Sequence, residues 1–569
     1  MGLSNQWNRC ASLRCLFLVH SSWKNDSKFT IHHSWNRHLA CHHIGRAQKW
    51  SYKNRIPVIT FSCLATDVSS KSDNKITPRS EDYSAWYLHV IQAAQLADQS
   101  AVKGCLVIRP YGYAVWELLR DHLDKLIKET GAQNAYFPLF IPQSFLSKEA
   151  EHVEGFAKEC AVVTHHRLRL NTNSTLEPDP EAMLEEPLIV RPTSETLIWN
   201  MFQKWISSYR DLPLCINQWA NVVRWELRTR PFLRTTEFLW QEGHTAHTNA
   251  KEAMDKAKEM LNVYTQLCEE LLAIPVIKGC KSPSERFAGA EETFTIEAMM
   301  QNGWALQSGT SHFLGQNFAK AFQVYYTDTS SQEQLVWATS WGASTRLLGA
   351  LIMTHSDDIG LVLPPKVAPI QVIIIPIWKS QVDKEDTLRV SQKLLEQLKG
   401  AQIRAKLDDR DYIRPGSKYF EWERKGIPLR IEIGPRDVVD GVVTIASRIG
   451  NQKKYALPCN ESLTMHIQQQ LENMQRCLFQ QAKERMDSRT FRNVSFDEMK
   501  RRLNEKDIQK QGFFLVPWKC NAIHEERIKA ETKATIRCYP FDMQHLVKNE
   551  KCFYSGEPAT HMALFARAY

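Results

Sequence analysis

The chain has 569 residues, a length that predicts three or four domains. Its 14 cysteines are scattered without a dense framework, which excludes a disulfide-stapled scaffold and suits a reducing compartment. No stretch approaches the roughly 18 apolar residues that span a bilayer. Eight of the nine net positive charges lie in residues 1–66, so charge gives no argument that the rest of the chain binds nucleic acid.

Residues 1–66 form a basic leader. They hold nine Lys or Arg and one acid, Asp26, and they are rich in Ser, His and Trp. They lack the compact apolar core and the small-residue cleavage site of a secretory signal. This composition predicts a transit peptide for the mitochondrion or the chloroplast, and the alternative is a disordered basic tail. The polar stretch 67–80 predicts a linker.

Helical and strand-like patterns alternate over residues 81–364. One helical pattern begins at Tyr83, and another over 115–128 stops near Gly131, a residue suited to the end of a helix. Strand patterns then alternate with helical ones through about residue 360. We expect a mixed α/β (α+β) fold here, with an antiparallel sheet flanked by helices.

The segment 221–247, NVVRWELRTRPFLRTTEFLWQEGHTAH, combines cations and a carboxylate around a loop. Arg224 stands two residues before Glu226, and Arg234 follows within the loop. A planar guanidinium can hold an α-phosphate in bidentate fashion, and a nearby carboxylate can fix it. The pattern predicts a nucleotide-activating site. The alternative is a surface salt bridge, with Glu226 only an ion-pair partner for Arg224.

Two further constellations support this site. Thr193 and Glu195 lie in RPTSE, just before a helix-like segment, where Thr193 could instead be the helix N-cap. Arg346 begins an apolar helical pattern within SWGASTRLLG (340–349), which follows QSGTSH (307–312). A cation at that point can reach a terminal phosphate, and the small residues before it allow close approach to a ligand.

These three segments, in this order, resemble the motifs of class II aminoacyl-tRNA synthetases. Residues 131–142, with Pro138, are similar to the first, dimer-forming motif, residues 222–247 to the second and residues 340–349 to the third. The Thr-x-Glu pair, FLWQEGH and QSGTSH are similar to signatures of the prolyl-tRNA synthetases of the archaeal/eukaryotic-like type. The resemblance runs from about residue 80 to Tyr569, and the leader makes it an organellar form.

The resemblance implies a ligase that activates L-proline with ATP and transfers the prolyl group to the 3′ end of tRNA(Pro). It implies a homodimer that uses ATP with Mg²⁺, has no membrane partner and needs no acid/base residue. The implied residues are, for catalysis, Arg224, Glu226 and Arg346; for L-proline, Thr193, Glu195, Arg224, His312, Trp341 and Gly342; for ATP, Arg224, Arg234, Thr235, Gln307, Thr310, Ser344 and Arg346. His312 and Trp341 could instead be core residues.

A compact α/β domain is expected at 365–460, after a proline-rich hinge at 361–369. The predicted strands are 370–378, 402–408, 428–433 and 441–447, and the predicted helices are 383–398 and 417–425. By resemblance this is the anticodon-binding domain. Its expected base readers, each of which could instead pair with neighbours on a solvated face, are Lys418, Glu423, Arg430, Arg436 and Asp437.

Residues 461–569 are expected to form a C-terminal domain, with long charged helices over 462–510 and then a small mixed region. Relatives of this type often carry a four-Cys zinc site here. This chain offers Cys520, His524, Cys552 and Ser555, which make at most three good ligands for a tetrahedral zinc ion. We therefore expect the structural zinc to be absent and assign no metal ligand.

The spacing of 66 residues from His244 to Thr310 leaves no room for the editing domain that bacterial-type relatives insert there. We expect no hydrolysis of mischarged alanyl-tRNA. Two competing interpretations are another class IIa synthetase, of the threonyl or histidyl type, and a catalytically impaired tRNA-binding paralogue. The Thr-x-Glu signature and the lack of a catalytic zinc-ligand set argue against the first. Arg224 and Arg346 argue against the second.

Overall fold

The computed structural model describes residues 75–146, 159–450, 454–505, 507 and 510–569. The predicted leader at 1–66 and most of the predicted linker at 67–80 lie outside these residues. No helix in the described ranges is both long enough and apolar enough to cross a membrane.

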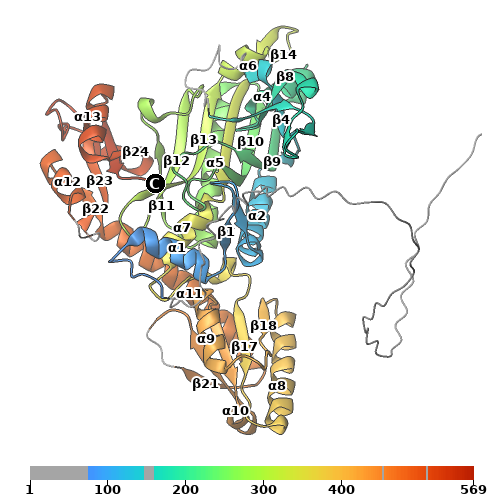
Figure 1. The fold of residues 1–569 in the computed structure, drawn as a ribbon. Coiled ribbons are helices and arrows are strands. Elements are labelled where there is room, and N and C mark those ends of the chain that lie inside the picture. Colours follow the sequence, from blue (N-terminus) through green and yellow to red (C-terminus); the bar gives the residue numbers. More distant parts are fainter. Residues whose placement is uncertain (1–74, 147–158, 451–453, 506, 508–509) are drawn as a thin grey trace, which may run out of the picture. The chain divides into compact units, whose positions relative to one another are not determined.

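An eleven-stranded sheet organises most of the chain (Figure 1). Its middle strands are antiparallel, as predicted, and only the pairs β3–β9 and β22–β23 are parallel. In spatial order the strands are β22 (Thr490–Arg492), β23 (Phe513–Trp518), β25 (His561–Ala566), β24 (Thr535–Pro540), β11 (Val276–Cys280), β12 (Glu292–Met299), β13 (Ala305–Gly315), β16 (Trp337–Ser344), β10 (Glu237–His247), β9 (Leu214–Val223) and β3 (Gln133–Asn134).

Helix α5 (Ala250–Gln266) covers one face of this sheet (Figure 1). Its first turn is capped by the Asn249 side chain, which accepts from the Glu252 amide at 2.9 Å. Its buried residues, among them Met260 and Tyr264, recur at helical spacing and join the largest core cluster. The other face of the sheet is thereby left available for a ligand.

The remaining helices of this part have recognisable starts and stops. Helix α2 begins with Pro110 in its first turn and ends at Glu129, and Gly131 follows with φ of +86°, as the sequence predicts. The other helices are α1 (Tyr83–Ala93), α4 (Glu195–Trp205), α6 (Asn317–Phe322) and α7 (Arg346–His355).

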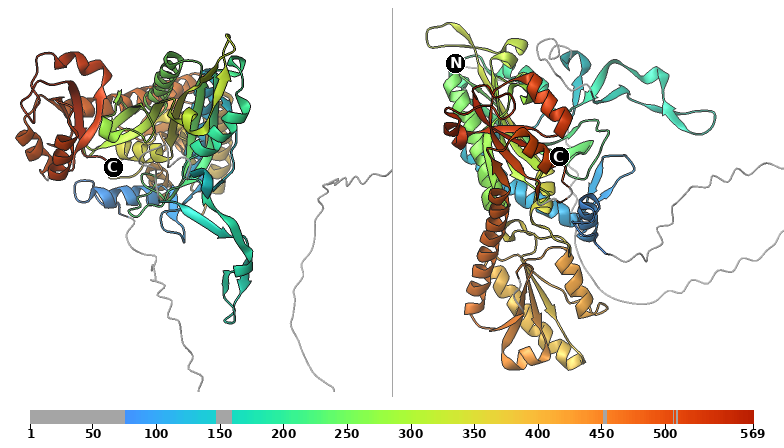
Figure 2. Two further views of the ribbon diagram at one scale, coloured as in Figure 1. Left: turned by 90° about the horizontal axis from the view of Figure 1, so that it is seen from above. Right: turned by 90° about the vertical axis from the view of Figure 1, so that its left-hand side faces the viewer.

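Short strands form small sheets beside the main one, and the β6–β7 hairpin extends away from it (Figure 2). These strands are β1 (Ala97–Gln99) with β2 (Leu106–Ile108), β4 (Phe140–Pro142) with β8 (Met183–Val190) and β5 (Ala161–His165), β6 (Leu168–Leu170) with β7 (Leu176–Pro178), and β14 (Tyr325–Thr327) with β15 (Glu333–Leu335).

A separate five-stranded sheet confirms the predicted α/β domain. Its strands, in spatial order, are β18 (Ala405–Leu407), β17 (Val372–Pro376), β19 (Leu429–Ile433), β20 (Val442–Ser447) and β21 (Tyr455–Pro458), and its helices are α8 (Gln381–Gly400), α9 (Pro415–Arg424) and α10 (Pro435–Asp440). The aliphatic side chains of the preceding proline-rich segment 361–369, including Leu361 and Leu363, are buried in the core.

The C-terminal part begins with α11 (Ser462–Ser488), followed by α12 (Phe496–Leu503) and α13 (Ala522–Thr532). The predicted run of helices over 462–510 misses β22 at Thr490–Arg492. The first turns of α11 pack on the five-stranded sheet through Leu463 and Ile467, whereas Met486 near its end joins the core under β23–β25. Strand β24 pairs with β11, so the C-terminal strands extend the main sheet.

One buried ion pair ties the five-stranded domain to the residues after α7. Arg448 binds Asp357 in bidentate fashion, at 2.7 and 2.8 Å, and the Arg448 side chain is 3% exposed. Burial alone would raise the pKa of Asp357, but Arg448 and two backbone amides hold it below its usual value. Removing one partner of such a pair is destabilising, because the other charge is left buried and unpaired.

We expect Arg448→Met to lower the free energy of unfolding by about 2 kcal/mol, less than for a fully buried pair since Asp357 is partly exposed. The depressed pKa means that the wild-type advantage is present above about pH 4 and is lost as the pH falls further. Urea unfolding at pH 7 and pH 3 measures both effects. The exposed Arg476→Met is the control, and an equal loss in both variants would contradict this role.

Candidate active site

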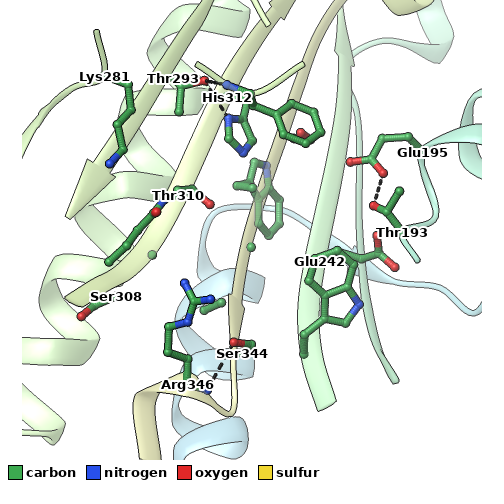
Figure 3. A pocket seen from close by; sticks show the side chains of 18 of the residues that line it. Thr193, Glu195, Glu242, Lys281, Thr293, Ser308, Thr310, His312, Ser344 and Arg346 are labelled. Carbon is green, nitrogen blue, oxygen red and sulfur yellow. Dashed lines mark hydrogen bonds between the residues drawn. The ribbon is translucent and has the colours of Figure 1, made fainter. Parts of the chain in front are cut away.

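A cavity of about 320 Å³ opens on the sheet face opposite α5, over strands β10, β16, β13 and β12 (Figure 3). Its lining combines carboxylates, guanidinium groups and hydroxyls. The side chains that line the cavity come from the predicted segments and from the strands between them.

The register of the strands places these side chains on one face. Glu242 pairs with Gly342, which pairs with Thr310 on its other side. In the next row His244 lies opposite Ser340, and Ser340 opposite His312. Residues directly opposite each other in an antiparallel sheet share a face, so both rows point into the cavity.

An irregularity between β12 and β13 adds one more residue. Ile296 pairs with Gly309, but Glu297 pairs with Gln307, so Ser308 is an extra residue in β13. A bulge of this kind shifts the alternation of the strand by one. Gln307 and Thr310 therefore both line the cavity, although they are three residues apart.

Carboxylates gather at one end of the cavity. Glu195, in the first turn of α4, is 5% exposed and accepts a hydrogen bond from the Thr193 hydroxyl. Glu242 accepts from the Ser194 hydroxyl at 2.5 Å and from the Gln218 amide at 2.8 Å. These contacts hold two acidic groups close together in a place that can receive a cation.

His244 lies beside Glu242, with its Nε2 3.4 Å from the carboxylate. Burial alone would raise the pKa of Glu242, but His244, Ser194 and Gln218 together hold it below its usual value. Within the described ranges, Glu195, Glu242 and His244 are the only three His, Cys, Asp or Glu side chains whose ligand atoms lie within 4.8 Å of one another. The expectation of no metal ligand remains a prediction.

Two guanidinium groups also line the cavity. Arg224 follows β9 directly, donates from Nε to the Pro192 carbonyl at 2.9 Å and lies against Trp240, 5.1 Å from the ring centroid. Arg346 is the first residue of α7. Burial, with repulsion from Arg224 and Arg234, lowers the pKa of Arg346 to about 10, so it remains a cation at neutral pH.

Most predicted site residues meet in this cavity. The residues that line it as expected are Thr193, Glu195, Arg224, Gln307, Thr310, His312, Gly342, Ser344 and Arg346, whereas Trp341 borders it from the opposite face of the sheet. Arg234 and Thr235 line neighbouring hollows instead, although the charge of Arg234 is felt by Arg346. Glu226 does not line the cavity: its carboxylate accepts from the Arg228 amide at 2.8 Å, and none of the ion pairs of the described residues joins it to Arg224.

The structure decides between the alternatives for two single residues. Thr193 is not the N-cap of α4, because Ser194 occupies that position and Thr193 bonds Glu195. Trp341 alternates with Ser340 and Gly342, so its indole points to the α5 face, where it is 2% exposed and joins the core. It supports the floor of the cavity instead of facing a ligand.

His312 is both a packed histidine and a cavity residue. Its Nδ1 lies 3.1 Å from the Thr293 hydroxyl, and its ring stacks on Phe287 at 4.4 Å. Burial, with repulsion from His244, lowers the pKa of His312 to about 3. The imidazole is therefore neutral at physiological pH.

The sequence reasoning missed several lining residues, above all Glu242 and Lys281. Glu242 stands in the same alternation as Trp240 and His244, and that period of two could have revealed it. Lys281 gives no such signal, because its partner Glu297 lies on another strand.

The predicted anticodon residues have mixed positions. Lys418 is corrected: it is 2% exposed and donates to the Asp408 carbonyl at 2.9 Å, because it faces the domain interior. Arg430 pairs with Glu432 at 2.9 Å, and Asp437 caps α10 by accepting from the Gly434 amide. The remaining two are the exposed Arg436 and the half-buried Glu423.

The predicted remnants of a zinc site do not converge in the described C-terminal part. Cys552 is buried in the apolar core of that part, whereas Cys520 is exposed and receives the Tyr539 hydroxyl at 3.8 Å. His524 packs against Tyr554, and Ser555 contacts Glu557. The absence of a structural zinc stays a prediction, which metal analysis of the purified protein would test.

Comparison with known proteins places the chain. Residues 179–355 match the family model "tRNA synthetase class II core domain (G, H, P, S and T)", residues 371–470 match "Anticodon binding domain", and residues 496–569 match "Prolyl-tRNA synthetase, C-terminal". Proteins named Proline–tRNA ligase from Amoebophilus asiaticus and Porphyromonas gingivalis are each 52% identical to it. The matches span 496 and 501 residues, 87% and 88% of this chain and 99% and 100% of the relatives.

The chain belongs to the prolyl-tRNA synthetase family. A crystal structure of prolyl-tRNA synthetase from Cryptosporidium parvum, complexed with halofuginone and AMPPNP, agrees with a TM-score of 0.80 at 41% identity. The match covers 88% of this chain and 98% of the Cryptosporidium parvum chain. The family consists of ATP-dependent aminoacyl-tRNA ligases with a class II fold, so the predicted fold class and family are confirmed. All the cavity residues lie within the part that matches the class II core.

We expect Gly243→Ala to destabilise the cavity floor. A Cβ at Gly243 would lie 2.1 Å from the Trp341 ring, so the indole or the strands must shift. Overpacking of this kind costs about 1–3 kcal/mol. Thermal unfolding measures it, with Gly400→Ala as the control because nothing lies within 4 Å of its added Cβ. Equal melting temperatures for Gly243→Ala and the wild type would contradict the packing described.

Proposed function

We propose that the protein is a proline–tRNA ligase that forms prolyl-adenylate from L-proline and ATP and then transfers the prolyl group to tRNA(Pro). The observation that carries this proposal is the arrangement of charge in one cavity: the carboxylates of Glu195 and Glu242 lie on one side and Arg346 lies on the other (Figure 3), with Arg224 within electrostatic reach of all three. Proline carries an ammonium and a carboxylate, and ATP brings phosphates. The names of the relatives support the same substrate.

Proline fits between these charges. Its secondary ammonium has two hydrogens to donate, and the Thr193 hydroxyl and the Glu195 carboxylate can accept them. A buried ammonium needs such a partner, since burying an unpaired charge is costly. The proline carboxylate then points toward Arg224, whose guanidinium lies within the electrostatic reach of Glu195.

The phosphates of ATP fit the guanidinium groups. Arg224 can bridge the proline carboxylate and the α-phosphate, which brings two anions together for in-line attack. Arg346 can hold the outer phosphates, while Gln307 and Thr310 border the nucleotide. Mg²⁺ enters with ATP, and the class II core shared with a relative solved with AMPPNP supports ATP as the substrate.

The first step needs no general base, because the attacking group is already a carboxylate. His312 cannot serve as an acid near neutral pH, since its pKa is about 3. The rate of activation should therefore depend on the charges of the cavity and on the positions of the reactants more than on proton transfer.

We propose tRNA(Pro) and a second copy of this chain as partners. The match to an anticodon-binding domain at 371–470 supports the first, with exposed Arg436 available to a base. For the second, Tyr136 and Phe140 in the segment like the first class II motif are 74% and 45% exposed. Light scattering that gives a monomeric mass at micromolar concentration would contradict the homodimer.

We also propose that the protein works in a mitochondrion or chloroplast. The acid-poor, basic composition of residues 1–66 supports import. One bacterial relative is matched over its whole length by 88% of this chain, so part of this chain has no counterpart there. Fusion of residues 1–66 to a fluorescent protein tests the idea, and diffuse cytosolic signal would contradict it.

Editing in cis is absent from this proposal, because the 66-residue spacing from His244 to Thr310 is filled by α5, β11, β12 and part of β13. Release of alanine from Ala-tRNA(Pro) by the pure protein would contradict this. A catalytically impaired tRNA-binding paralogue is the remaining alternative, and the cavity's retained Arg224 and Arg346 argue against it.

We expect amino-acid-dependent ATP–pyrophosphate exchange with proline, exceeding that with threonine or histidine. Arg224→Ala should lower this exchange by about 10²-fold or more, because it removes the cation between two anions. Glu226→Ala is the matched control from the same loop and should keep most of the activity, since Glu226 lies outside the cavity. Folded protein that shows no exchange with any amino acid would favour the tRNA-binding paralogue.

A further inference from the structure

A buried ion cluster joins the C-terminal strands to the cavity. Glu297 on β12 accepts from Lys281 Nζ at 2.9 Å, and Arg537 on β24 binds the same carboxylate at 3.1 Å. The side chains of Glu297, Lys281 and Arg537 are 0%, 3% and 9% exposed. Glu297 and Arg537 are 240 residues apart in the sequence.

The backbone brings this arginine to its place. Strand β24 pairs with β11 through Gly279–Pro540 and Cys280–Tyr539, and Lys281 is the residue directly after β11. A Cβ on Gly279 would lie 2.6 Å from the Tyr539 carbonyl, so glycine permits this close approach. The C-terminal strands therefore hold the strand end that carries Lys281.

A second contact fixes the same strand end. The Ser282 hydroxyl donates to Glu525 of α13 at 2.8 Å, and both residues are buried. C-terminal residues therefore contact both Glu297, the ion-pair partner of Lys281, and Ser282, its neighbour in sequence. Lys281 itself lines the cavity.

The charges of the cluster do not cancel. One carboxylate faces two cations, so the buried group carries a net positive charge. Lys281 lies on the same side of the cavity as Ser308, Thr310 and Arg346, away from Glu195 and Glu242 (Figure 3). Both Glu297 and Arg537 act on the pKa of Arg346, the first raising it and the second lowering it, which places all three within electrostatic reach.

We propose that Arg537 is a positioning residue for amino-acid activation: through Glu297 it keeps Lys281 at the cavity wall and keeps that wall cationic for the outer phosphates of ATP. Without Arg537, Glu297 and Lys281 form a neutral pair, and the Lys281 ammonium is drawn away from the cavity. The C-terminal domain would thereby complete the phosphate site, whether or not it binds zinc. This inference rests on the proposed function for its substrate.

The test compares ligands with and without outer phosphates. In the full chain, Arg537→Met should weaken binding of a non-hydrolysable ATP analogue and of pyrophosphate by about fivefold or more, measured by calorimetry. Binding of AMP and the KM for proline should stay within about twofold, a change of about 0.4 kcal/mol. Arg537→Lys should restore pyrophosphate binding, because it restores the charge.

The matched control is Arg567→Met, because Arg567 lies in the same C-terminal part but contacts Thr532 and Asn504 instead of Glu297. If Arg537→Met does not fold, Arg537→Gln keeps a donor while it removes the charge, and the same ligands are compared. Unchanged pyrophosphate binding, or equal weakening of AMP and pyrophosphate, would overturn the proposal. Calorimetry needs no turnover, so a wild type that binds ATP but lacks proline-dependent exchange would refute the proposed function and not this inference.

Discussion

The strand register of β10, β16 and β13 is the constraint on which the site depends. It sets Glu242, Gly342 and Thr310 in one row and His244, Ser340 and His312 in the next. A slip of one residue would turn every one of these side chains to the face that α5 covers. The apolar residues on that face, with Trp341 packed over Gly243, make such a slip costly.

Charge is then distributed along this face. The carboxylates and guanidinium groups of the cavity are partly desolvated before any substrate binds, and burial, with repulsion among the cations, lowers the pKa of Arg346 to about 10. A zwitterion and a polyphosphate would satisfy both kinds of charge together. The neutral His312 and the glycine at position 342 leave room between them without adding a competing charge.

Much of the fold could be predicted because local patterns agree with it. The predicted helix 383–398 corresponds to α8 at Gln381–Gly400, and the predicted strand 428–433 to β19 at Leu429–Ile433. Strand β22 was missed because its three residues are too few to show the alternation that identifies a strand. The joining of β24 to β11 could not be predicted, since it pairs segments about 260 residues apart.

The site could be predicted where a motif identifies the chemistry of a residue. It was harder to predict where the direction of a side chain decides whether that side chain reaches the cavity. Arg224, Thr193 and Glu195 lie in the cavity as their motifs indicate, whereas Glu226 stands in the same motif and lies outside it. The sequence predicts that Lys418 is an exposed cation, but the fold buries it against Asp408. Lys281 depends on Glu297 and Arg537, so only the folded sheet shows its place.

The central claim is that the two ends of one cavity hold the two ends of an adenylate. A crystal structure with a non-hydrolysable prolyl-adenylate analogue tests it most directly. The account predicts the secondary ammonium within hydrogen-bond distance of Thr193 and Glu195, and the phosphate mimic on Arg224. An analogue bound elsewhere, or with its ammonium away from these two residues, would contradict the account.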